Sequence, residues 1–109
     1  MESLNYFISI LAPHEDARIL RNLSRQYGSR LENLDTESKL AIRAVLTRYV
    51  YFKKFYIREF LIIDAIVDAI PDYSNLICDI LKGLQGLSDR SCEILIELIT
   101  MQQIDSVVD

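Results

Sequence analysis

Apolar residues recur along this chain at intervals of three and four residues, the spacing that places them on one face of an α-helix. Between residues 4 and 11 this spacing predicts a first, short helix. Pro13 suits the first position of a second helix. That helix should run to about Gly28, because glycine readily adopts the backbone conformation that ends a helix.

Residues 36–70 carry the longest pattern of this kind. Asp35 or Thr36 can cap a helix here, and neither Gly nor Pro interrupts it before Pro71. Its predicted core stripe comprises Ile42, Val45, Tyr49, Phe52, Tyr56, Phe60, Ile63, Val67 and Ile70. An uninterrupted helix of this length would span about 50 Å, whereas a compact domain of this size is roughly 34 Å across. We therefore expect the helix either to kink near Tyr49 to Phe55 or to project and pair with another chain.

Two further helices follow the long pattern. Residues 73–85 repeat the helical spacing and end near Gly86, and Ser88 or Asp89 can cap a last helix that runs to about residue 107. Strict alternation of apolar and polar residues, which would indicate strands, does not occur. The sequence predicts an all-α bundle of about five helices, with one long central helix over about 36–70.

The composition is that of one ordinary globular domain spanning 1–109. Half of the residues are hydrophobic, about a quarter are charged, and only three glycines and two prolines interrupt the chain. Asp64 and Asp68 interrupt the most apolar stretch well short of a membrane span. Cys78 and Cys92 lie within apolar helical patterns, which indicates reduced thiols in the core of a cytoplasmic protein.

The predicted long helix also carries a second, weaker apolar line outside the core stripe. Its members are Leu46, Val50, Ile57 and Leu61. A helix that is apolar on two sides is either central in its bundle or covered by a partner. We interpret this line as an oligomer interface, most simply that of a two-fold homodimer.

Charge is segregated along the chain. From Arg18 to Arg58 there are ten Lys or Arg and three Asp or Glu, whereas from Glu59 to Asp109 there are two Lys or Arg and ten Asp or Glu. The candidate partner-binding residues of the basic part are Arg18, Arg21, Arg25, Arg43, Tyr51, Lys54 and Arg58. These charges either pair with one another, within the chain or across a dimer, or dock an acidic protein or a nucleic acid.

Aromatic and basic residues are interleaved in the stretch RYVYFKKFYIREF, residues 48–60. Cations that follow phosphates and rings that stack on bases are what a groove for single-stranded nucleic acid requires. Tyr49, Phe52, Tyr56 and Phe60, however, belong to the predicted core stripe. We therefore interpret most of the aromatic density as burial.

The sequence shows no recognisable catalytic constellation. His14 is the one histidine, and no phosphate-binding glycine loop or metal-ligand spacing occurs. We expect no enzymatic activity, cofactor, metal, small-molecule substrate or membrane insertion. The leading hypothesis is a non-enzymatic protein–protein interaction module (an adaptor, regulator or complex subunit) that acts as a homodimer. The alternative is a nucleic-acid-binding protein that uses the basic region 18–58.

Overall fold

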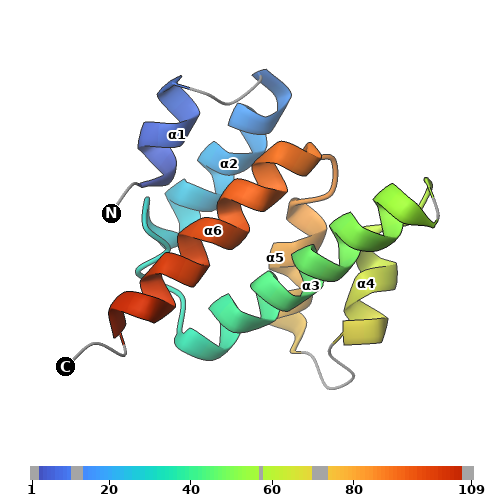
Figure 1. Ribbon diagram of the computed structural model, residues 1–109. Coiled ribbons are helices and arrows are strands. Elements are labelled where there is room, and N and C mark those ends of the chain that lie inside the picture. Colours follow the sequence, from blue (N-terminus) through green and yellow to red (C-terminus); the bar gives the residue numbers. More distant parts are fainter. Residues whose placement is uncertain (1–2, 11–13, 57, 70–73, 107–109) are drawn as a thin grey trace.

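The computed structural model of the chain describes residues 3–10, 14–56, 58–69 and 74–106, and in these it forms helices without any strand (Figure 1). The helices are α1 (Leu4–Ile10), α2 (His14–Tyr27), α3 (Thr36–Phe55), α4 (Ile62–Ala69), α5 (Asn75–Gly83) and α6 (Asp89–Ser106). The prediction of an all-α bundle is confirmed. The described part spans 36 × 32 × 24 Å.

Several helix ends follow from local residue chemistry. The Asp35 carboxylate accepts a hydrogen bond of 2.8 Å from the backbone N–H of Ser38 and so caps α3. The hydroxyl of Ser74 accepts one of 3.2 Å from the N–H of Ile77 and caps α5 in the same way. At the other end of a helix, Gly28 follows α2 with a φ of +93°, a conformation that glycine adopts at little cost.

The predicted long helix is interrupted between Phe55 and Ile62, although no Gly or Pro lies there. Phe60 folds back and becomes buried, with its ring stacked on that of Phe52 at 5.3 Å between centroids. The N–H of Ile62 donates a 2.8 Å hydrogen bond to the side chain of Gln85. Tertiary contacts thus replace a turn of helix, and α4 packs back on α3.

The break changes which apolar residues of the predicted stripe are buried. Ile42, Val45 and Tyr49 lie in the core, as predicted. Tyr56 and Val67, in contrast, are largely exposed, so that the prediction is wrong for them. The predicted stripe was drawn for one uninterrupted helix that turns by 100° per residue, but α3 ends at Phe55. Ile70 lies outside the described residues.

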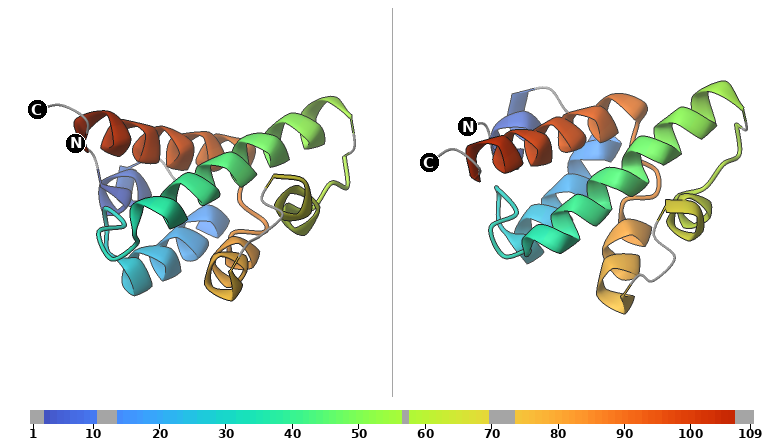
Figure 2. Two further views of the ribbon diagram at one scale, coloured as in Figure 1. Left: turned by 90° about the horizontal axis from the view of Figure 1, so that it is seen from below. Right: turned by 60° about the horizontal axis from the view of Figure 1, so that its bottom comes forward.

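α3 is the central element of the bundle and packs against α4, α5 and α6. In the left view of Figure 2, α6 forms one side of the molecule, α2 and α5 form the other, and α3 crosses obliquely between them. α1 covers part of α2.

A buried carboxylate joins α2 to the start of α6. Asp16 accepts hydrogen bonds from the backbone N–H of Ser88 at 3.1 Å, from the hydroxyl of Ser88 at 2.5 Å and from the hydroxyl of Ser91. Burial alone would raise the pKa of the Asp16 carboxyl, but these hydrogen bonds outweigh it and lower the pKa below its ordinary value. The N-terminal end of a helix also favours a negative charge.

Candidate functional site

α3 and α6 lie side by side and run in opposite directions. At one end, a guanidinium nitrogen of Arg43 is 3.5 Å from the hydroxyl of Thr100. At the other end, the ammonium group of Lys53 is 2.9 Å from a carboxylate oxygen of Asp89. The numbering therefore falls along α6 as it rises along α3, and this register sets which residues of the two helices lie level.

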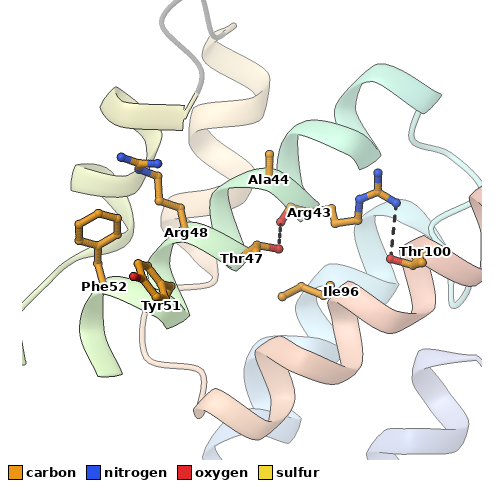
Figure 3. Close-up of a pocket in the computed structure, with 8 residues that line it drawn as sticks. All are labelled: Arg43, Ala44, Thr47, Arg48, Tyr51, Phe52, Ile96 and Thr100. Carbon is orange, nitrogen blue, oxygen red and sulfur yellow. Dashed lines mark hydrogen bonds between the residues drawn. The ribbon is translucent and has the colours of Figure 1, made fainter. Parts of the chain in front are cut away.

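An open groove of about 880 Å³ lies between the two helices (Figure 3). The residues that line it are Arg43, Ala44, Thr47, Arg48, Tyr51, Phe52, Ile96 and Thr100. None of them is acidic. Ala44 and Thr47 are small, and Thr47 donates its hydroxyl proton to the carbonyl oxygen of Arg43 at 2.7 Å. Small side chains therefore line the middle of the groove on α3, and the larger arginine and aromatic side chains lie on either side of them.

The two arginines of the groove point toward opposite ends, as Figure 3 shows. Arg43 extends toward Thr100. Arg48 lies over the ring of Phe52, with its guanidinium carbon 4.8 Å from the ring centroid. Because the two cations do not converge, they do not form a site for one small anion. Their separation suits an elongated ligand instead.

Exposed aromatic side chains gather at the end of α3. We call Tyr51, Phe55 and Tyr56 the aromatic ridge; they are 48%, 67% and 65% exposed. The rings of Phe55 and Tyr56 are 5.7 and 5.4 Å from that of Tyr51, and the Tyr51 and Tyr56 hydroxyls are 3.0 Å apart. This hydrogen bond raises the pKa of Tyr51 above its ordinary value. The interpretation of the aromatic density as burial is wrong for Tyr56; it is correct for Tyr49 and Phe60.

A third line, of mostly apolar residues, follows the outer side of α3, toward the groove and the ridge. It consists of Leu40, Ala44, Thr47, Tyr51 and Phe55, and all five are exposed. Their steps of four, three, four and four residues place them in one row along a helix. We call this row the outer row of α3. It was already present in the sequence, but two stronger apolar lines on the same helix concealed it.

The basic residues predicted to bind a partner do not form one surface. Arg18, Arg21 and Arg25 are exposed on α2, which contributes no residue to the groove between α3 and α6. Arg43 and Tyr51 line the groove. Lys54 and Arg58 are exposed near the ridge, and the Lys54 ammonium group is 6.0 Å from the ring centroid of Phe55. The basic region 18–58 is thus divided between two faces.

The predicted oligomer interface is divided as well. Leu46 and Val50 are buried in the core of the single chain, so the surface that they were expected to form is already covered by the chain's own helices. Leu61 is exposed, and Ile57 lies outside the described residues. α3 is apolar on several sides. Sequence periodicity did not reveal that α4, α5 and α6 would cover the side that carries Leu46 and Val50.

The two cysteines, which are chemically reactive side chains, both lie in the interior. Cys78 and Cys92 are free thiols and both are buried. Burial raises the pKa of Cys92 to about 12, despite the opposing charge of Lys53, so this thiol stays protonated at neutral pH. Among the described residues, no three His, Cys, Asp or Glu side chains lie where they could hold a metal ion.

In the same described part, none of the helices has the length and apolar character needed to cross a membrane. A scan against protein-family models and searches of curated proteins and of solved structures found no match to this chain.

Proposed function

We propose that this chain is a non-enzymatic interaction module (an adaptor, regulator or complex subunit) that binds another polypeptide through the face formed by α3 and α6. The observation that carries the proposal is the outer row of α3, which stays exposed beside an open groove. A helix with buried apolar residues on its inner sides and a further apolar row on its outer side is typical of one that another chain covers.

The residue types on this face also support protein binding. The rings of Phe55 and Tyr56 are both already in contact with that of Tyr51, so that little side-chain freedom would be lost on binding. Tyrosine and arginine are enriched among the residues that contribute most to protein interfaces. The two buried thiols further favour a reducing, cytoplasmic location.

Photo-crosslinking tests this function directly. We expect a photoreactive phenylalanine analogue at Tyr51, in the full chain expressed in its own cells, to form covalent adducts with protein. The same analogue at Asp79, an exposed position on α5, is the matched control and should form few. An absence of protein adducts at Tyr51, or equal yields at both positions, would contradict the proposal.

A second candidate function is binding of single-stranded nucleic acid. The exposed aromatic ridge, with Lys54 and Arg58 near it, favours this function. The pI of about 4.9 and the exposed Glu93 and Glu97 on α6 oppose it. Fluorescence anisotropy with labelled oligonucleotides at low salt should detect no complex if the protein-binding function is correct. Nuclease-sensitive adducts at Tyr51 would favour nucleic acid instead.

A further inference from the structure

The two helices of the binding face carry net charges of opposite sign, although α3 also has Glu37 and α6 also has Arg90. α3 contributes Arg43 and Arg48 to the groove, and Lys54 is exposed near its end. α6 presents Glu93 and Glu97, which are one helical turn apart and both exposed. The face therefore has a basic half on α3 and an acidic half on α6. A second copy of the face, turned so that its acidic half lies on the basic half of the first, is complementary to it in charge.

We propose that the occupant of this face is a second copy of the chain, related by a two-fold axis that runs between α3 and α6 and parallel to them. In this dimer, α3 of each protomer lies across the interface on α6 of the other. The inference rests on the proposed function, because it names the partner of the same surface.

Electrostatics selects this axis over the other simple one. A two-fold axis lying in the face but perpendicular to the helices would place α3 on α3 and α6 on α6. It would place the basic residues of α3, such as Arg43 and Lys54, opposite the basic residues of the copy's α3, and like charges brought together across an interface oppose association. The axis parallel to the helices places the basic α3 of each protomer opposite the acidic α6 of the other, so that this contact occurs twice in the dimer.

The register within one chain sets the pairs across the dimer, because an axis parallel to the helices keeps every residue at its own level. Arg43 is level with Thr100, and Glu97 is three residues from Thr100, about 4.5 Å along the helix. Arg43 therefore comes within reach of Glu97 of the partner subunit. Both side chains are long enough to cover that difference in level.

Apolar residues meet in the same arrangement. By the same register, Leu40 lies close to the level of Ile104, and Thr47 close to the level of Ile96. Leu40 and Ile104 are both exposed in the single chain, and Ile96 is half-buried at the groove. In the dimer the outer row of each α3 faces these α6 residues of the other protomer, so that four helices pack around apolar contacts with charges at the margin.

Sedimentation equilibrium of the full chain at low salt, from micromolar to several hundred micromolar, tests the dimer. We expect a reversible equilibrium between the 12.6 kDa chain and twice that mass. Arg43→Glu and Glu97→Arg should each weaken dimerisation by about tenfold or more, and the double variant should recover to within about threefold of the original chain. Addition of salt should weaken the original dimer.

Two further variants complete the test. Arg21→Glu makes the same charge change as Arg43→Glu, but at an exposed position on α2. It should leave dimerisation unchanged. Ala44→Arg inserts a long side chain into the exposed centre of the outer row and should abolish the dimer. At a concentration where the original chain is monomeric, the thermal melt of this variant should match that of the original chain.

A chain that stays monomeric over the whole concentration range overturns the inference, and so does a dimer that none of the α3 and α6 variants affects. A double variant no better than the singles contradicts the α3-on-α6 arrangement. The two proposals fail differently: a Tyr51 adduct with another protein retains the proposed function and rejects the second copy as occupant, whereas an absence of protein adducts rejects the function itself.

Discussion

Asp16 illustrates what a single residue does in this fold. In the sequence it is an acidic residue in the first turn of a helix, which is favourable for that helix alone. In the structure it is buried and accepts hydrogen bonds from Ser88 and Ser91 at the start of another helix, α6. One carboxylate thus satisfies polar groups more than seventy positions away in the chain.

Replacement of Asp16 by Asn should lower the free energy of unfolding by about 1–3 kcal/mol at neutral pH, because buried hydrogen-bond donors lose a charged acceptor. The folded-state pKa of Asp16 is lowered below the ordinary 3.8. This contribution to stability is therefore fully present above that value and is lost as the pH falls through the folded-state pKa.

Urea denaturation of the original chain and of the Asp16→Asn variant at a series of pH values measures this effect. The difference between the two should be largest near neutral pH and should shrink in acid. A difference that stayed constant down to the most acidic pH would contradict a role for the charged carboxylate.

At the scale of single elements, the glycines allow a matched comparison. Gly28 ends α2 with a φ of +93°, a left-handed backbone conformation that residues with a side chain rarely adopt. Gly28→Ala should therefore destabilise the fold by about 1–2 kcal/mol. The added Cβ would also meet the carboxylate of Glu32, but that exposed side chain can move aside. Gly83 is the last residue of α5 and has open space around it, so Gly83→Ala should stabilise the fold by roughly 0.5–1 kcal/mol. Chemical denaturation should give changes of opposite sign for the two variants. A stabilising effect of Gly28→Ala would show that the turn after α2 tolerates a side chain.

We expect the break between α3 and α4 to depend on the buried Phe60 rather than on the exposed rings before it. Phe60→Ala removes a buried ring stacked on Phe52 and should lower the unfolding free energy by about 3 kcal/mol. Phe55→Ala changes a ring that is 67% exposed and should alter it by no more than about 0.5 kcal/mol. Thermal melts and urea titrations of both variants check this. Similar losses for both would mean that the aromatic ridge belongs to the folding core.

At the scale of the whole molecule, small-angle X-ray scattering separates the single chain from its assemblies. The Cα radius of gyration of the described chain is 13.3 Å, and the scattering value at high dilution should lie close to it. The value should rise with concentration as dimers form, and it should stay low for Arg43→Glu. A value well above 13 Å at the highest dilution would indicate that α3 and α4 form one projecting helix.

The sequence alone determined the helical character and most of the helix boundaries. The reason is that these features depend on interactions between residues only three or four positions apart. Asp35 with Ser38 and Ser74 with Ile77 are such pairs, and glycine needs no distant partner to adopt the φ found at Gly28. The segregation of basic and acidic residues was equally visible, because it follows from counting along the chain.

Only the tertiary structure decided how these elements are used. α3 carries apolar residues on several sides, and local periodicity cannot rank those sides; packing by α4, α5 and α6 buried Leu46 and Val50 and left the row through Tyr51 in water. At the break before α4, the N–H of Ile62 donates a hydrogen bond to Gln85, which is distant in sequence. The groove likewise exists because α3 and α6, separated by two other helices in the chain, lie side by side. Such contacts form between residues that the fold brings together, and no local pattern records them.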